Sequence, residues 1–377
     1  MAAELLIVGA GILGLAHALA GLRAGLRVTV VEREARANGA SIRNFGFITV
    51  TGQQAGLTWR RAMRARDIWA ELAGPAGIPV QHRGLLMAAR RPEALAVLEE
   101  FAATAMGAGC HILRGAALKA AAPMLQGDLV GGLYSPHEIR VESRDAIPQV
   151  TAWLASQGVR FLPRTAVHAV RSGAVDTAAG TLRADYIVVC PGPDLVSLFP
   201  EIMARRDVTL CKLHMLRLAD PGWRLPAAVM SDLGLVRYLG YAMPSLPALR
   251  ARLEAEQAAQ LADGIHLIAV QSADGSLVVG DSHHYDPTPD PFQPEAVDRR
   301  MLEEYEAVTG RPAPAVLERW IGVYPSGPEV AFTEAPCTGV RLAMVTSGTG
   351  ASTAFAIAEE TLADLLGTNP PAHTRCA

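Results

Sequence analysis

The chain has 377 residues, half of them hydrophobic, so it is long enough to form two domains with a sizeable core. Its formal net charge of -3 excludes the strongly basic surface that nucleic-acid binding requires. We find no apolar run long enough to span a bilayer and no secretory signal before the first predicted strand, so we expect a cytoplasmic protein without a membrane partner.

The segment 1–34 predicts a nucleotide-binding strand, turn, helix and strand. The apolar run at 5–8 leads into Gly9-Ala10-Gly11-Ile12-Leu13-Gly14, and a helical stretch follows before the second apolar run at 28–31. Glycines at this spacing permit the tight turn, the approach of a pyrophosphate and the close packing of the helix on the strand. Glu32 ends the second strand, where an acid can hydrogen-bond an adenosine ribose. We therefore expect a Rossmann-like domain with cofactor contacts from Gly9, Gly11, Ile12, Leu13, Gly14, Glu32 and Arg33.

The region after Glu32 distinguishes between NAD and FAD, because both cofactors use the same opening unit. An NAD enzyme would continue with regular alternation of strands and helices. Here a polar segment with interspersed glycines, residues 38–48, is suited to lie along an extended cofactor. Helices are predicted at 58–72, 92–107 and 142–157, and a strand at 160–170. A buried strand at 184–190 ends at Pro191-Gly192-Pro193 and would bring its carboxyl end to the dinucleotide.

The remaining elements predict a second sheet that is mainly antiparallel. Its strands are expected at 84–88, 129–134, 208–218, 264–271 and 276–281, and its helices at 248–262 and 295–308. Five cysteines lack the spacing of a zinc site or of a disulfide framework: Cys110, Cys190, Cys211, Cys337 and Cys376. We expect these thiols to be reduced and mostly buried, and we expect no bound metal.

The order of these motifs resembles that of the FAD-dependent oxidoreductases of the D-amino acid oxidase superfamily, which includes glycine oxidase and sarcosine oxidase. The opening glycine pattern, the strand at 185–192 and the ending Val345-Thr346-Ser347-Gly348-Thr349-Gly350-Ala351-Ser352-Thr353 before a helix occur in the same order there. The resemblance implies an α/β protein with a discontinuous, Rossmann-like FAD domain of the glutathione reductase type, formed by 1–80, 141–208 and 335–377. Residues 81–140 and 209–334 would form an α+β substrate domain.

The resemblance also implies noncovalent FAD. Some sarcosine oxidases attach the flavin to a cysteine, but the segment just after Trp320 contains none, since Cys337 lies well beyond Pro325. Further cofactor contacts are expected from Ser41, Arg43, Asn44, Ala166, Val167, Gly192, Gly348, Gly350 and Thr353. Two alternatives stay open: Arg43 and Asn44 can stabilise their own loop, and the last glycine-rich turn can be an ordinary helix cap.

Three strings narrow the resemblance to a subgroup associated with 2-aminoethylphosphonate breakdown: residues 41–46 (SIRNFG), 135–144 (SPHEIRVESR) and 280–285 (GDSHHY). In that subgroup the expected reaction is oxidation of the C–N bond of 2-aminoethylphosphonate or its N-methyl derivative. Hydride transfer to flavin N5 would give an imine, which water converts to phosphonoacetaldehyde and the amine. Oxygen or another acceptor would then reoxidise the flavin.

The anionic end of such a substrate requires an anchor, and the family pattern differs at that point. Glycine oxidase-like proteins often carry an arginine just before a proline after Trp-x-Gly, whereas this chain has Tyr324 in Trp320-Ile321-Gly322-Val323-Tyr324-Pro325. Arginine forks, imidazolium and hydroxyl groups suit a phosphonate. The candidates are Arg140, Arg237, His283 and His284, with Tyr241 and Tyr324 as hydroxyl donors; each one taken alone has a structural alternative.

Lys212 is the candidate for a catalytic side chain on the oxygen-activating face of the flavin, by resemblance to sarcosine oxidases; a solvent-facing lysine at a strand edge is the alternative. Two other functions are compatible with the sequence. One is oxidation of an ordinary amino acid, as by glycine or sarcosine oxidases, or of a 2-hydroxyacid. The other is a flavin-binding subunit that has no turnover without a partner chain.

Overall fold

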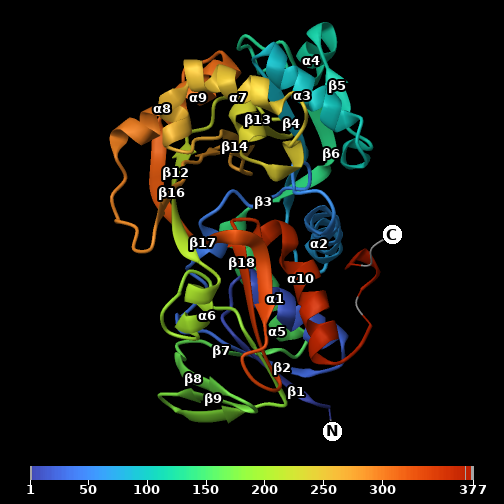
Figure 1. The fold of residues 1–377 in the computed structure, drawn as a ribbon, viewed down its shortest axis with the longest axis vertical. Helices are drawn as coiled ribbons and strands as arrows, with labels where there is room; N and C mark the ends of the chain where they lie inside the picture. Colours follow the sequence, from blue (N-terminus) through green and yellow to red (C-terminus); the bar gives the residue numbers. More distant parts are fainter. Residues whose placement is uncertain (1, 370, 375–377) are drawn as a thin grey trace.

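The computed structural model describes residues 2–369 and 371–374 and has a parallel half and an antiparallel half (Figure 1). Five parallel strands form the first half in the order β18 (Val340–Ser347), β11 (Tyr186–Val189), β1 (Glu4–Val8), β2 (Arg27–Val31) and β7 (Arg160–Leu162). The predicted strand at 184–190 is thus confirmed as β11, which pairs with β1 in parallel.

Both faces of the parallel sheet are buried. Side chains alternate between the two faces along β1, so neighbouring residues pack against different elements. Leu5 and Ile7 pack with α1 (Ile12–Arg23), α2 (Leu57–Ala73), α5 (Ser143–Ser156) and α10 (Gly350–Leu365). Leu6 faces the other way, toward α6 (Pro200–Arg205) and a three-stranded sheet of β8 (Val167–Arg171), β9 (Ala174–Thr177) and β10 (Gly180–Arg183). Near-continuous apolar runs are what such doubly covered strands require.

The antiparallel half contains the long strands β4 (Val80–Ala89), β6 (Gly131–Val141), β12 (Thr209–Leu218) and β17 (Val316–Glu334), with β13 (Ala228–Ser231), β14 (Ile268–Gln271) and β15 (Leu277–Gly280) among them; its one parallel pair in the described chain is β4 with β13. Short strands β3 (Phe47–Ile48), β5 (His111–Leu113) and β16 (His284–Asp286) pair at its sides. Figure 1 shows the helices of this half gathered at one end of the molecule: α3 (Pro92–Ala102), α4 (Gly115–Ala121), α7 (Leu246–Glu256), α8 (Ala258–Ala262) and α9 (Glu295–Thr309).

Several predicted elements end or divide where local chemistry interrupts them. The strand expected at 160–170 divides into β7 and β8, because Pro163 has no backbone N–H and Arg164 has a φ of 55°. The helix expected at 248–262 divides at Gln257, whose side chain bridges Arg91 and Glu304 at 2.7 Å each. The helix expected at 92–107 ends at Ala102.

Strand β17 joins the two halves into one fifteen-stranded sheet. Its residues 316–326 pair with β12, and its residues 331–334 pair with β18 after a register shift between Ser326 and Ala331. None of the described helices is long and apolar enough to cross a membrane. Among the described cysteines, Cys110, Cys190, Cys211 and Cys337 are free thiols, and Cys376 lies outside the described residues.

Candidate active site

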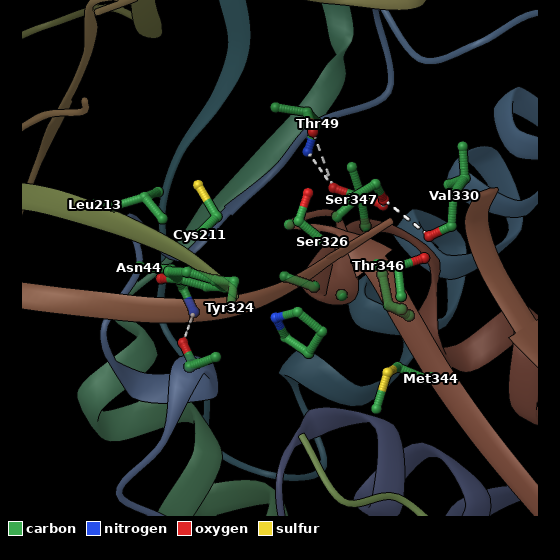
Figure 2. Close-up of a pocket in the computed structure, with 18 of the residues that line it drawn as sticks. Asn44, Thr49, Cys211, Leu213, Tyr324, Ser326, Val330, Met344, Thr346 and Ser347 are labelled. Atoms are coloured by element: carbon green, nitrogen blue, oxygen red, sulfur yellow. Dashed lines mark hydrogen bonds between the residues drawn. The ribbon is translucent and has the colours of Figure 1, made fainter. Parts of the chain in front are cut away.

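A cavity of about 410 Å³ lies between the two halves of the sheet, and residues of both halves line it. At one end it meets the turn after β1 and the turn before α10. At the other it meets β12, β17 and the loops around β14 and β15. Figure 2 shows part of this wall, with Cys211, Leu213 and Tyr324 on one side and Val330, Thr346 and Ser347 on the other. Cavities of this size commonly bind small molecules.

The first glycine turn is packed so closely that it excludes larger side chains. A Cβ at Gly14 would overlap the carbonyl of Gly9, and Gly9, with a φ of 104°, faces the carbonyl of Cys190. Gly11, Ile12, Leu13 and Gly14 line the cavity. Ser41 lies beside them, and its Oγ accepts a hydrogen bond of 2.9 Å from the N–H of Ile12. The cradle at the start of α1 therefore fits a dinucleotide phosphate.

Glu32 and Arg33 lie next to this turn, outside the cavity. The Glu32 carboxylate accepts hydrogen bonds from the N–H groups of Ala10 and Glu34 at 2.8 and 2.9 Å. Arg33 pairs with Asp194 at 2.6 Å. Thr165 donates its N–H to the carbonyl of Glu32 at 2.8 Å, which brings the adjoining Ala166 and Val167 to the same edge. That edge suits the adenosine end of an extended cofactor.

The second glycine-rich turn lines the cavity from Ser347 to Ser352, with Gly348 and Gly350 within it, and Gly192 lies on the wall as well. The turn is held by hydrogen bonds from the Ser347 hydroxyl to the carbonyl of Val330 at 3.0 Å and from the N–H of Thr49 to Ser352 Oγ at 2.9 Å (Figure 2). Thr353 does not line the cavity, since it is buried and its hydroxyl bonds the carbonyl of Thr349 within α10.

The loop at 40–46 combines the two roles left open by the sequence. Asn44 lines the cavity, yet its amide donates to the carbonyls of Ala40 and Ser41 at 2.9 and 3.0 Å. Arg43 does not line the cavity; its carbonyl accepts a hydrogen bond of 2.9 Å from the hydroxyl of Tyr324. Tyr324 lines the cavity, but its proton is directed toward that carbonyl, and burial raises its pKa.

The structure removes Arg140 from the predicted anchors. Its side chain has no exposed surface and lies inside the antiparallel half. The guanidinium donates to the carbonyls of Phe45 and Gln271 at 3.1 and 3.3 Å, to Glu142 at 2.9 Å and to the Ser272 hydroxyl at 3.2 Å. Four of its five N–H groups are engaged in this buried network, so Arg140 stabilises the fold.

Three other predicted residues also lie away from the cavity. Lys212 is buried and does not line the cavity, and its ammonium pairs with Asp290 at 2.9 Å and with the carbonyl of Phe292 at 3.1 Å. Tyr241 is fully buried against Phe101, with a ring-centroid distance of 4.9 Å. His284 points to the opposite side of its strand, where its ring lies 5.5 Å from that of His214.

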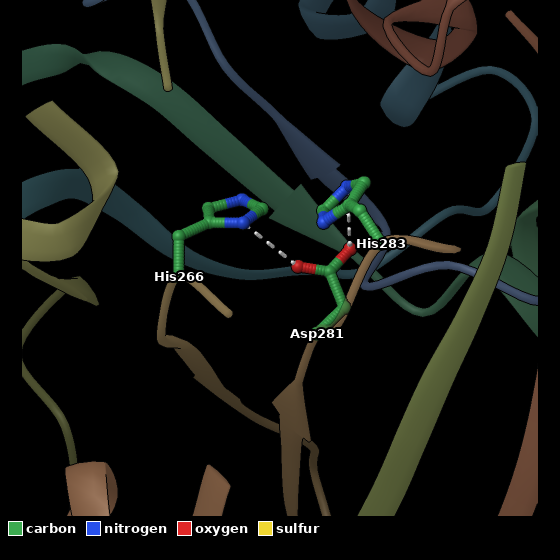
Figure 3. A group of neighbouring side chains, drawn as sticks. All are labelled: His266, Asp281 and His283. Atoms are coloured by element: carbon green, nitrogen blue, oxygen red, sulfur yellow. Dashed lines mark ion pairs between the residues drawn. The ribbon is translucent and has the colours of Figure 1, made fainter. Parts of the chain in front are cut away.

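A polar cluster lines the far end of the cavity: Arg237, His266, Asp281, His283 and Tyr285. Arg237 follows the 3-10 turn Asp232–Val236, is exposed, and donates to the Tyr285 hydroxyl at 3.0 Å. Asp281 lies between two imidazoles, with Oδ1 3.3 Å from His266 Nδ1 and Oδ2 3.8 Å from His283 Nε2 (Figure 3). Asp281, His266 and His283 have side chains of the kinds that bind divalent cations, and their ligand atoms lie within 4.8 Å of one another.

Burial dominates the electrostatics of this cluster. It raises the pKa of Asp281 to about 7, although the positive charge of Arg237 acts in the opposite direction. Burial and then Arg237 lower the pKa of both His266 and His283 well below the usual value. At neutral pH the imidazoles are therefore uncharged and the carboxyl is near its midpoint.

Sequence reasoning found Arg237 and His283 but missed His266, Asp281 and Tyr285. A signal was present in Gly280-Asp281-Ser282-His283-His284-Tyr285, because extended residues alternate between two sides. Asp281, His283 and Tyr285 line the cavity, and the intervening residues do not. His266 had no comparable signal, since it lies in a loop before β14 and meets the cluster only in the fold.

The sequence matches the family model described as DAO, FAD dependent oxidoreductase, over residues 4–365. Glycine oxidase from Geobacillus kaustophilus has the same fold, with a TM-score of 0.78 and 18% identity over 97% of this chain and 96% of that one. Iminodiacetate oxidase from Chelativorans sp. BNC1 has a TM-score of 0.73 and 18% identity, covering 97% and 96%. L-alpha-glycerophosphate oxidase from Mycoplasma pneumoniae, solved with FAD bound, has a TM-score of 0.72 and 15% identity, covering 100% and 98%. No curated protein sequence matches the chain.

Proposed function

The chain belongs to the family of FAD-dependent oxidoreductases, and from this premise we propose that it oxidises the C–N bond of 2-aminoethylphosphonate or its N-methyl derivative. FAD is the cofactor of the family, and when bound it accepts the hydride that leaves the carbon beside the amine. Water then converts the resulting imine to phosphonoacetaldehyde and the amine. The protein has to position the substrate, exclude water and hold the charges at the two ends of the substrate.

Arg237 is the observation that carries the proposal. Among the described residues that line the cavity it is the only arginine or lysine. A phosphonate has three acceptor oxygens and favours the donors of a guanidinium, and Tyr285 holds that group in place from a neighbouring strand. Tyr324 occupies the position at which related oxidases often carry an arginine, which favours an anion held at Arg237 over the carboxylate site of those enzymes.

The opposite charges of the cluster suit a zwitterion. Arg237 can pair with the phosphonate, while the carboxylate of Asp281 attracts the ammonium. At the other end of the cavity, the start of α10 lines the wall, and its N–H groups would stabilise negative charge on reduced FAD bound there. Gly11 to Gly14, Ser41 and Asn44 would hold the cofactor without a covalent bond.

Anaerobic mixing tests the proposal. The purified flavoprotein is mixed with N-methyl-2-aminoethylphosphonate, 2-aminoethylphosphonate, sarcosine or glycine, and the visible absorbance of the flavin is followed. Bleaching by the phosphonates is the expected result, and it would also show that the isolated chain reduces its flavin without a partner. Bleaching by sarcosine or glycine alone would assign the chain to amino acid oxidation. Readmission of air then tests oxygen as the electron acceptor.

Arg237→Met provides the matching variant. It keeps the length of the side chain but removes its charge and donors, so we expect the KM for the phosphonates to rise about 10- to 100-fold, the equivalent of roughly 1.5–3 kcal/mol for hydrogen bonds to a charged group. Arg299→Met is the control, since Arg299 is exposed on α9 and pairs with Glu303. An unchanged KM in Arg237→Met would show that the anion binds elsewhere.

A further inference from the structure

The amine of the proposed substrate has to lose a proton before it can be oxidised. An alkylamine is an ammonium ion at neutral pH, and a hydride leaves the adjacent carbon only when the nitrogen has a free electron pair. The cavity lies between the two halves of the sheet and is partly open. A group on its wall that accepts the proton would act next to the bound substrate, without transfer to bulk water.

Most of the ionisable side chains on the wall cannot accept it. Arg237 is already cationic, because guanidinium groups stay protonated in proteins. Burial raises the pKa values of Tyr238, Tyr324, Cys190 and Cys211, so these groups keep their own protons.

Glu329 is already engaged, since its carboxylate pairs with Arg206. Tyr285 accepts the hydrogen bond from Arg237. Of the ionisable residues that line the cavity in the described part of the chain, this leaves Asp281 and the two imidazoles beside it.

We propose that Asp281, with His266 and His283 next to it, takes the proton from the ammonium of the substrate before the C–N bond is oxidised; the inference rests on the proposed function. The N–H bond breaks, its electron pair stays on nitrogen, and the proton binds the Asp281 carboxylate. Asp281 is the catalytic residue of the step because it faces the cavity. The two histidines act through Asp281 as positioning residues and as the next proton acceptors.

Hydrogen bonding fixes how His283 takes part. Its Nδ1 lies 2.9 Å from the carbonyl of Gly264, and a carbonyl only accepts, so Nδ1 carries the hydrogen. Neutral His283 therefore presents the lone pair of Nε2 to Asp281 Oδ2, 3.8 Å away. On the other side of the carboxyl group, neither His266 Nδ1 nor Asp281 Oδ1 has a hydrogen-bond partner among the described residues. Both imidazoles are buried and lie close together, with ring centroids 4.9 Å apart.

The charges around the cluster favour a proton over a metal ion. The positive charge of Arg237 lowers the pKa of both imidazoles, and it opposes a divalent cation about twice as strongly as a proton, because the metal ion carries two charges. Asp281 interacts electrostatically with several charged or titratable groups around it. They are Arg237, Tyr238, Cys211, Tyr324 and the flanking His266 and His283.

The pH dependence of flavin reduction tests the step. Burial raises the pKa of Asp281 to about 7, so the carboxylate that accepts the proton is present above this pH and is lost below it. In the wild-type flavoprotein the rate of reduction by N-methyl-2-aminoethylphosphonate should fall as the pH drops through about 7. In Asp281→Asn the rate at neutral pH should fall on the order of 100-fold and recover only toward the higher pKa of the free amine. His283→Gln should shift the midpoint of the profile.

Asp286→Asn is the matched control, because Asp286 lies on β16 nearby but is exposed, and it should keep the wild-type profile. A second measurement requires no substrate. In infrared difference spectra of the flavoprotein, the carbonyl band of a protonated carboxyl should titrate near pH 7 and be absent from Asp281→Asn. Metal analysis of the wild-type protein should find no stoichiometric divalent ion.

The two proposals fail in different ways. If neither phosphonate reduces the wild-type flavin, the proposed function is wrong. If the wild-type flavin is reduced but Asp281→Asn shows the same pH profile, only the proton-acceptor role is wrong. The absence of a titrating carboxyl band, or one equivalent of tightly bound metal, would also overturn that role.

Discussion

The two ends of the cavity are built in different ways. The cofactor end consists of backbone: two glycine turns, at 9–14 and 347–352, place N–H groups at the starts of α1 and α10. The other end, which we call the substrate end because the proposed substrate would bind there, consists of side chains on separate segments, with Arg237, His266 and Asp281 brought together by the antiparallel half. We infer that steric changes at the glycines affect cofactor binding, whereas substrate choice depends on individual side chains.

The largest effect is expected for Arg140→Met. This variant tests whether a buried residue behind the cavity wall takes part in substrate binding. The substitution leaves the buried carbonyls of Phe45 and Gln271 without a donor and weakens the pairing of Glu142, so the free energy of unfolding should fall by about 3–5 kcal/mol. Urea unfolding measures this loss, with the exposed Arg252→Met as control. The KM for the phosphonate should stay within about twofold, whereas a large rise in a folded variant would return Arg140 to the anchor set.

A change of intermediate size, Gly14→Ala, tests the cofactor end. The added Cβ overlaps the carbonyl of Gly9, so we expect a loss of about 1–3 kcal/mol of stability together with lower FAD content. Thermal unfolding and the ratio of flavin to protein absorbance measure the two effects. Gly39→Ala is the control, because a Cβ there meets no atom within 4 Å and the φ of Gly39 is -90°. Wild-type flavin content in Gly14→Ala would contradict the backbone account.

The smallest effect is expected for Tyr324→Phe, at the boundary between the two ends. The variant loses the hydrogen bond to the carbonyl of Arg43, worth about 0.5–1.5 kcal/mol, and should bind the phosphonate as before. Tyr285→Phe removes the partner of Arg237 and should raise the KM instead. If the KM rises more in Tyr324→Phe than in Tyr285→Phe, the hydroxyl of Tyr324 contacts the substrate.

The cofactor end was the more predictable from sequence, because its information is local. The strand, glycine turn and helix around Gly9 and Gly14 are set by neighbouring residues, and the predicted strand at 184–190 pairs beside β1. The resemblance to FAD-dependent oxidoreductases was likewise confirmed by the family match. The hydroxyl of Thr353 bonds the carbonyl of Thr349, and its predicted contact with the cofactor stays a prediction.

The substrate end was predicted only in part, because its contacts join distant segments. Arg140 and Lys212 have the composition of ligand-binding residues, but their partners, Gln271 and Asp290, lie far along the chain and bury them. Arg237 and His283 line the cavity, and their contact with the substrate stays a prediction. The alternation within 280–285 would have added Asp281 and Tyr285, whereas the position of His266 depends on the fold as a whole.

The parallel order of the sheet also determines when cofactor binding can begin during synthesis. Strand β1 is made first, but one of its neighbours is β11, and β11 in turn pairs with β18 near the other end of the described chain. The second glycine turn follows β18 directly. The first glycine turn is therefore synthesised long before the second glycine turn, which forms the opposite wall of the cavity. Uptake of FAD should thus be a late event that marks a fully assembled chain, and the central strand needs protection from wrong pairing until then.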